Sequence, residues 1–319
     1  NTALGNDSLR ANTTGSENTT VGSASMLGNT TGANHTAVGR HSLRCNTTSS
    51  DNTAVGRCAA YTNTTGSCLV AMGNNALRFN TTANANVAIG RDAMCANTTG
   101  ANNAALGYGT LCKNTTGADN VAAGTDALTG NTTGVGNVAI GQLSLCVNTT
   151  GDKNTALGTS ALKKNTTADE NTAVGVNSLC ANTTGNLNTA VGADSLRVNV
   201  GGYNNTAVGY TALQNNTSGV CNTAVGLEAL GSNTTGTVST AVGLGALSGQ
   251  TTGDNNTAVG MRALRVSTTG KFNVAMGNEA LTANTTACNN TAIGWRAGCS
   301  ITTGARNVAI GAVSLDNNT

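Results

Sequence analysis

A glycine occupies every seventeenth position of this 319-residue chain, from Gly5 to Gly311, without a single insertion or deletion. The surface loops of an ordinary globular domain tolerate changes of length, so a fixed short period is not expected from one. A strict period indicates a stack of equivalent units in which each repeat contacts its neighbours. We therefore divide the chain into rows of seventeen residues starting at Asn1, and we call equivalent positions columns 1 to 17.

The columns separate into two chemical classes. The consensus row is N-T-A-V-G-x-x-A-L-x-x-N-T-T-G-x-x, and it gives eighteen full rows and one partial row. All 30 charged residues, all seven aromatic residues and all ten cysteines fall in columns 6, 7, 10, 11, 16 and 17. None of the other eleven columns carries a charge, which predicts that the six variable columns face solvent and the others face contacts.

The first five columns predict a short strand. Alternation places Thr2 and Leu4 on one face and Asn1 and Ala3 on the other. Column 2 accepts threonine or valine, which is typical of a packed β position. We expect columns 2, 4 and 9 to form the core. Columns 3, 5 and 8 hold small residues, so they would let a backbone or a partner chain approach closely, for example at Ala190.

The whole chain is expected to be all-β, as a parallel β-solenoid or β-roll with one 17-residue row per turn. Seventeen residues are too few for a helix, a strand and their connections. Proline, which would remove a ladder donor, is absent. We expect one repeat array over residues 1–319 with successive rows about 4.8 Å apart. No atypical capping repeat is visible, which favours a window on a longer fibre or a rod whose ends meet other copies.

Composition argues against several classes of function. The net charge is +2 with 9% charged residues, and no basic stripe is visible, so we expect no nucleic-acid binding. No run of eighteen apolar residues predicts a membrane span. No column repeats acidic residues as a calcium-binding solenoid would, and no C-x-x-C pair suggests zinc. We therefore expect neither a metal site nor a cofactor.

We do not expect an enzyme. The V-G-x-x-A-L segment of columns 4 to 9 matches one hexapeptide unit of the left-handed β-helix acyltransferases. The other eleven residues of the row do not match, and the period is seventeen, not eighteen. The only histidines, His35 and His41, lie in one row with no carboxylate repeatedly beside them. We expect both to be surface substitutions.

Column 12 supplies candidate N-glycosylation sites, because its asparagine precedes Thr-Thr in most rows. The acceptors are Asn12, Asn29, Asn46, Asn63, Asn80, Asn97, Asn114, Asn131, Asn148, Asn165, Asn182, Asn216, Asn233 and Asn284. Acceptors in other columns are Asn6, Asn18, Asn34, Asn204, Asn215, Asn255, Asn289 and Asn317. The alternative is an asparagine ladder in which side-chain amides bond from row to row.

One pair of cysteines is a candidate disulfide. Cys95 and Cys112 share column 10 on successive rows, where a stacked spacing of about 4.8 Å falls within disulfide range. The alternative is that the cysteines of these outer columns are free surface thiols.

The row N-T-A-V-G-x-x-A-L resembles the S-V-A-I-G-type repeats in the YadA-like head domains of trimeric autotransporter adhesins. It is more similar still to the N-T-A-V-G/N-T-T-G repeats of phage, large-virus and bacterial surface-fibre proteins. The likeness covers essentially the whole chain, although seventeen residues per turn is longer than in the adhesin heads. It implies a left-handed β-roll in an extracellular or virion-surface protein that is rod-like and often trimeric.

The expected function is therefore a non-catalytic structural rod of a surface fibre that associates with its own copies, as a trimer or filament, and carries glycans. The alternative is an adhesin that binds a host receptor or carbohydrate. A minor alternative is an ice-binding protein, because regular threonine ladders order water. However, Thr13 and Thr14 are adjacent and point to opposite faces, and no T-x-T row is repeated.

Overall fold

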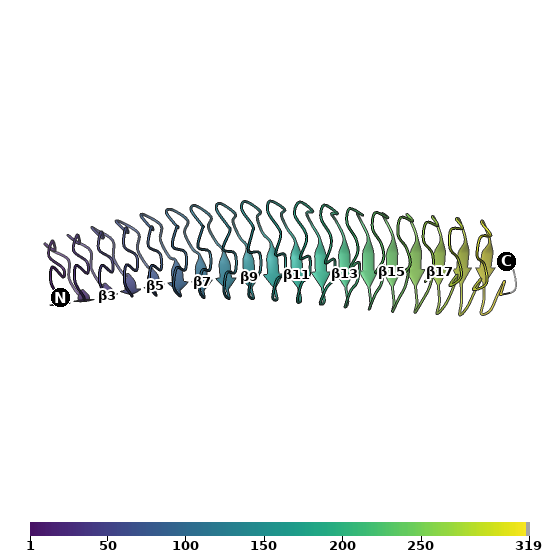
Figure 1. The fold of residues 1–319 in the computed structure, drawn as a ribbon, viewed down its shortest axis with the longest axis horizontal. Helices are drawn as coiled ribbons and strands as arrows, with labels where there is room; N and C mark the ends of the chain where they lie inside the picture. Colours follow the sequence, from purple (N-terminus) through teal and green to yellow (C-terminus); the bar gives the residue numbers. More distant parts are fainter. Residues whose placement is uncertain (317–319) are drawn as a thin grey trace. The chain divides into compact units, whose positions relative to one another are not determined.

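The computed structural model describes residues 1–316, and compact packing divides the chain into two units, Asn1–Thr159 and Ser160–Thr319. Each strand occupies columns 2 to 4 of one row, with one strand per turn (Figure 1). The first unit contains β1 (Thr2–Leu4), β2 (Thr19–Val21), β3 (Thr36–Val38), β4 (Thr53–Val55), β5 (Val70–Met72), β6 (Val87–Ile89), β7 (Ala104–Leu106), β8 (Val121–Ala123), β9 (Val138–Ile140) and β10 (Thr155–Leu157). The second unit contains β11 (Thr172–Val174), β12 (Thr189–Val191), β13 (Thr206–Val208), β14 (Thr223–Val225), β15 (Thr240–Val242), β16 (Thr257–Val259), β17 (Val274–Met276), β18 (Thr291–Ile293) and β19 (Val308–Ile310).

Within each unit, every strand pairs in parallel with the strand of the next row, and identical columns face each other. In β13 and β14, for example, Ala207 aligns with Ala224 and Val208 aligns with Val225. The prediction of an all-β parallel solenoid with one 17-residue row per turn is therefore confirmed. Its handedness stays a prediction. The described residues contain no helix long and apolar enough to cross a membrane.

Backbone bonds between rows continue outside the strands. Leu213 N–H donates to the Ala229 carbonyl at 3.0 Å, and Thr217 N–H donates to the Thr234 carbonyl at 2.9 Å. In the opposite direction along the stack, Cys221 N–H donates to the Tyr203 carbonyl at 3.1 Å. Turns and strands alike thus satisfy their backbone groups through the neighbouring rows, which is why a row needs no long strand to be ordered.

The interior is formed by columns 3, 8 and 9, so our assignment of the core was wrong for columns 2 and 4. Ala207, Ala212 and Leu213 are fully buried, whereas Val208 is 37% exposed. The alternation along the strand is as predicted, but the inward face carries the alanine. The column-9 side chain points across the interior toward the column-3 residue of the same row. A Cβ on Gly298 would lie 3.7 Å from the Cβ of Ala292. Column 3 therefore has room only for small side chains: it holds alanine in every row but one, where Thr20 is fully buried and bonds to Ser8 through its hydroxyl.

Burial of column 3 also removes the interface that the sequence suggested there. Ala190 has no exposed surface within its own chain. A partner chain cannot reach it, and replacing it by leucine would overpack the coil and not test assembly.

Two columns of asparagine line the rest of the interior. In column 12, the Asn216 amide donates to Asn199 Oδ1 at 2.8 Å and to the Gly219 carbonyl at 3.0 Å. In column 1, the Asn205 amide donates to the same carbonyl at 2.9 Å. Asn205 Oδ1 in turn accepts from the backbone N–H of Asn222. These buried amides satisfy one another and the turn of columns 15 to 17, so the polar layer is compatible with burial.

Candidate functional site

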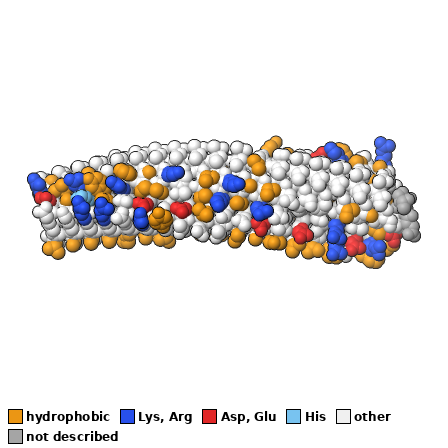
Figure 2. Space-filling view, viewed as in Figure 1, with side chains coloured by type: hydrophobic (Ala, Val, Ile, Leu, Met, Phe, Trp, Pro, Cys, Tyr) orange, Lys and Arg blue, Asp and Glu red, His pale blue; other side chains and the backbone are white. Residues whose placement is uncertain are grey.

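The outward face of the strands is the most regular exposed surface. We call columns 2 and 4 of a unit the sheet strip. In the second unit, Val191, Val225 and Ile293 of column 4 are 36%, 37% and 40% exposed. Columns 2 and 4 contain no charged residue in any row. Orange side chains lie along the lower edge of the second unit in Figure 2, on the side where Figure 1 draws its strands. Column 4 thus forms a continuous apolar stripe beside the mostly threonine column 2, and contiguous exposed apolar surface marks interaction sites in soluble proteins.

The sheet strip of the first unit contains a hollow. Ala104 in column 2 and Ala123 in column 4 are smaller than the side chains around them. They leave a recess of about 270 Å³ whose other lining includes Ile89, Leu106 and Val121. An apolar side chain of a partner could fill this recess.

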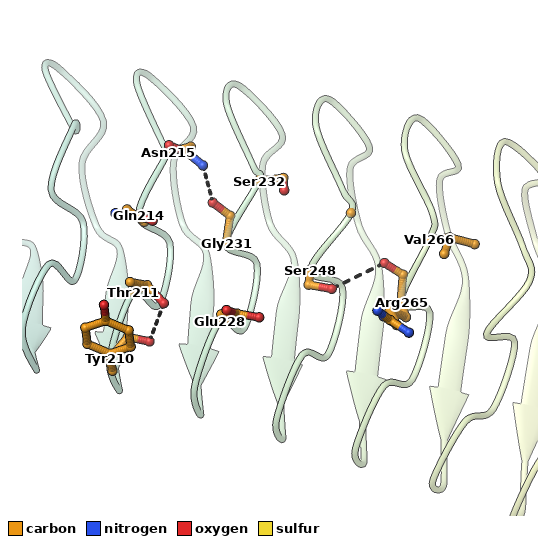
Figure 3. Close-up of a pocket in the computed structure, with 11 residues that line it drawn as sticks. Tyr210, Thr211, Gln214, Asn215, Glu228, Gly231, Ser232, Ser248, Arg265 and Val266 are labelled. Atoms are coloured by element: carbon orange, nitrogen blue, oxygen red, sulfur yellow. Dashed lines mark hydrogen bonds between the residues drawn. The ribbon is translucent and has the colours of Figure 1, made fainter.

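A polar groove of about 820 Å³ opens on the variable columns of the second unit (Figure 3). Small residues in columns 10 and 11 of two successive rows create it, because no long side chain fills that space. The lining residues are Tyr210, Thr211, Gln214, Asn215, Glu228, Gly231, Ser232, Ser248, Gly249, Arg265 and Val266.

The groove offers hydrogen-bonding groups and one aromatic ring. Tyr210 is 55% exposed, and the Asn215 amide donates to the Gly231 carbonyl at 2.9 Å. Within residues 1–316, neither Glu228 nor Arg265 forms an ion pair. An open groove with donors, acceptors and a ring can hold a small polar ligand such as a sugar. Sequence reasoning missed this site because it depends on small residues in neighbouring rows.

The structure places the column-12 acceptors in the interior. Asn12 is half-buried, and the side chains of Asn29, Asn46, Asn63, Asn80, Asn97, Asn114, Asn131, Asn148, Asn165, Asn182, Asn216, Asn233 and Asn284 are fully buried. These columns form the asparagine ladder given above as the alternative, as in the bond from Asn233 to Asn216 Oδ1 at 2.9 Å. An amide nitrogen that donates twice inside the coil has no room for a sugar. Occupancy of these sites stays a prediction, and the folded geometry opposes it.

Acceptors in other columns differ in accessibility. Asn18 is buried in column 1, and Asn317 lies outside the described residues. The exposed acceptors are Asn6, Asn34, Asn204, Asn215, Asn255 and Asn289. Sugars on the folded chain would therefore be accommodated on columns 6, 11 and 17.

The structure brings Cys95 and Cys112 together. Their Sγ atoms are 3.0 Å apart, and both residues are half-buried thiols. The hydrogen bond from Cys95 to Cys112 lowers the pKa of Cys112 to about 7 and, for the same reason, raises the pKa of Cys95. Stacking on successive rows is thus confirmed, and the disulfide itself stays a prediction.

The two histidines occupy different environments. His35 is buried, so the expectation of a surface substitution was wrong for it. It takes the place of a column-1 asparagine, and its ring contacts the Ser49 carbonyl and the backbone N–H of Asn52 at 2.8 and 3.2 Å. Burial lowers the pKa of His35, which favours its neutral form. His41 remains at the surface. Across residues 1–316 no three His, Cys, Asp or Glu side chains are grouped to hold a metal ion.

No protein-family model matches this chain, and no curated protein matches it either.

Proposed function

We propose that this chain is a non-catalytic structural component of an extracellular or virion-surface fibre, and that its copies associate through their sheet strips. The observation that carries this proposal is the exposed face of columns 2 and 4, which is apolar throughout column 4, mostly threonine in column 2, and without charge in any of the nineteen rows. An uncharged surface that continues from row to row lowers the solubility of a free chain. Covering it with a partner is favourable, because apolar area is then removed from water.

A second copy is the partner that fits this surface best. Its own strip has the same residues and the same row spacing of about 4.8 Å. Side chains of two such strips can interdigitate in register over many rows, as in paired cross-β faces. The recess at Ala104 and Ala123 gives a place for one larger side chain of the partner, because column 4 also holds Met72 and Met276.

The test places charge on the strip and leaves the interior intact. The triple variant Val208→Lys, Val225→Lys and Val242→Lys changes three column-4 side chains that are 36–37% exposed. We expect the unaltered chain to sediment as an oligomer and the variant to sediment as a folded monomer, because buried ammonium groups would face one another. Analytical ultracentrifugation measures the mass, and circular dichroism checks the fold.

The matched control adds the same charge to column 6 of nearby rows. Tyr210→Lys, Leu227→Lys and Leu244→Lys change side chains that are 55%, 42% and 44% exposed, and assembly should survive. If the unaltered chain is a monomer, or if both variants dissociate equally, association through the strip is wrong. If the chain is a monomer and its solution freezes at a lower temperature than the one at which ice melts in it, this gap would instead support ice binding by the threonine–valine face.

The groove at Tyr210 favours an adhesin as the second candidate. Its size suits a short oligosaccharide, and its ring and polar groups are those that bind sugars. In a screen of neutral glycans, we expect a ligand whose binding is lost with Tyr210→Ala and kept with Tyr203→Ala, another exposed tyrosine of the same unit. Absence of any ligand, or equal loss with both variants, would exclude this candidate.

A further inference from the structure

Arginine is concentrated in one segment of the first unit, although the net charge of the whole chain is only +2. Residues 18–91 contain Arg40, Arg44, Arg57, Arg78 and Arg91, but only one acidic residue. The rest of the chain keeps eleven of the sixteen basic residues and thirteen of the fourteen acidic ones. Our expectation that no basic stripe exists was therefore wrong for this segment.

Stacking places these arginines on one side of the coil. Arg40, Arg57 and Arg91 occupy column 6, and Arg44 and Arg78 occupy column 10, on rows about 4.8 Å apart. Figure 2 shows blue side chains gathered in this part of the first unit. We call Arg40, Arg44, Arg57 and Arg78 the arginine cluster.

Acidic residues do not neutralise the arginine cluster. The single acidic residue of the segment, Asp51, lies in column 17 and accepts a hydrogen bond from the Asn34 amide at 3.1 Å. Asp92, which follows Arg91 in the same row, pairs with it at 3.1 Å, so Arg91 is left outside the cluster. Burial and the charges of Arg40, Arg44 and Arg57 together lower the pKa of His41, which lies among them. The cluster is therefore a local excess of positive charge without an internal counterion.

Aromatic rings hold two of the guanidinium groups in place. Arg44 lies over Tyr61, with Cζ 5.6 Å from the ring centroid, and also donates to the Tyr61 hydroxyl. Arg78 lies over Phe79 at 5.0 Å. The Nε atoms of Arg44 and Arg78 are buried without a hydrogen-bond partner. Stacking fixes the planes of these groups and leaves terminal N–H groups to meet a ligand, so less side-chain entropy is lost on binding.

We propose that the arginine cluster binds the sulfate groups of a sulfated polysaccharide. Planar guanidinium groups bind tetrahedral oxyanions through paired hydrogen bonds. A row of cations along a straight stack matches a linear chain that carries anions at intervals. Single-stranded nucleic acid fits less well, because it needs free ring faces for its bases, and arginines occupy the faces of Tyr61 and Phe79. This site is separate from the sheet strip and does not depend on self-association.

The test uses heparin as the sulfated probe and, for comparison, desulfated heparin, which keeps its carboxylates but lacks the sulfate groups. Calorimetry at about 0.15 M salt should show binding of heparin only. Replacing Arg40, Arg44, Arg57 and Arg78 together by glutamine should weaken binding roughly tenfold to a hundredfold, as expected for the loss of four charged contacts at an exposed site. The dependence of affinity on salt should also become less steep.

The matched control removes four positive charges from the second unit, as Arg197→Gln, Arg262→Gln, Arg296→Gln and Arg306→Gln, none of which lines the groove at Tyr210. Binding of heparin should change less than threefold, and circular dichroism should show both variants folded. Equal weakening by the two variants would mean that the attraction is general, and would overturn the site. Failure of heparin to bind, or tighter binding of single-stranded DNA of equal charge, would overturn the proposed ligand.

Discussion

At the scale of the residue, the glycine of column 5 meets two constraints at once. Gly209 has φ of +138°, which side chains rarely adopt. A Cβ there would lie 2.5 Å from the carbonyl oxygen of Gly226 in the next row. Replacing Gly209 by alanine should therefore destabilise the second unit by roughly 2–4 kcal/mol, through strain and overpacking. Urea unfolding followed by circular dichroism measures the loss.

Gly201 provides the control for that substitution. It lies in column 14, and the nearest atom to a new Cβ would be Thr184 Oγ1 at 3.5 Å, an ordinary contact. Gly201→Ala should change the free energy of unfolding by less than about 0.5 kcal/mol. Similar losses of stability for the two variants would show that the glycine at every seventeenth position is required for a reason other than its backbone conformation and close packing.

Single residues also explain where sequence reasoning assigned the wrong face. The strand, its alternation and its period were predictable because column 5 and the uncharged columns recur without exception. The core was assigned by the size of Val208 and its equivalents, on the rule that large apolar residues lie inside. In a coil this thin, Ala207 is buried and Val208 is outside. Near-invariance of the small residue was the better signal, because the interior has room there for little more than alanine, with the buried Thr20 as the one exception.

At the scale of the row, the structure shows compensation between columns. Row 18 has Gly298 in place of the column-9 leucine and Ile301 in place of the column-12 asparagine. Ile301 is buried, and its Cδ1 lies 3.0 Å from where a Cβ on Gly298 would be. Ser239 and Gln250 behave alike, because the longer Gln250 amide reaches Ser239 Oγ at 3.2 Å. These exchanges were visible in the sequence, but their meaning requires knowing that columns 1, 9 and 12 meet inside.

The contact between two rows at Cys95 and Cys112 predicts a redox-dependent cross-link. Glutathione disulfide accepts two electrons and is released as two glutathione thiols while the two cysteines lose their protons and form one S–S bond. Because the attacking species is a thiolate and the pKa of Cys112 is lowered to about 7, cross-linking should be faster at pH 8 than at pH 6. Peptide mapping by mass spectrometry identifies the linked pair. The closed loop should stabilise the first unit by about 3 kcal/mol.

Two variants separate this cross-link from other thiol chemistry. Cys95→Ser should abolish the link and the gain in stability, whereas Cys221→Ser, which removes a thiol of the second unit, should leave both intact. A rate that still rises about tenfold per pH unit through pH 8 would show that Cys112 keeps an ordinary thiol pKa and that the bond between the two thiols does not activate it. Mixed disulfides with glutathione in place of the link would show that the rows hold the sulfur atoms apart.

At the scale of the whole molecule, the surfaces proposed to bind ligands arise from how rows are combined. The arginine cluster and the groove at Tyr210 are each assembled from variable columns of several rows. The consensus row of the repeat contains neither feature. The composition therefore indicates a nearly neutral protein. In the folded chain, however, stacking of the rows gathers positive charge in the first unit and small outer side chains in the second. The uniform columns set the fold, and the variable ones decide what each part of the surface can bind.

This division predicts that rows can be removed whole but not in part. Deleting residues 222–238 from the second unit joins column 17 of one row to column 1 of another, so every remaining column keeps an equivalent neighbour. Each row interacts with adjacent rows alone, and the loss should be limited to one row and one interface. Deleting residues 222–230 leaves an incomplete turn that places column 10 after column 17 and breaks the asparagine ladder. The first variant should keep one cooperative thermal transition, whereas the second should unfold in separate steps, because the incomplete turn uncouples the rows on its two sides. Circular dichroism should show β structure in both. Equal behaviour of the two deletions would contradict the row as the structural unit.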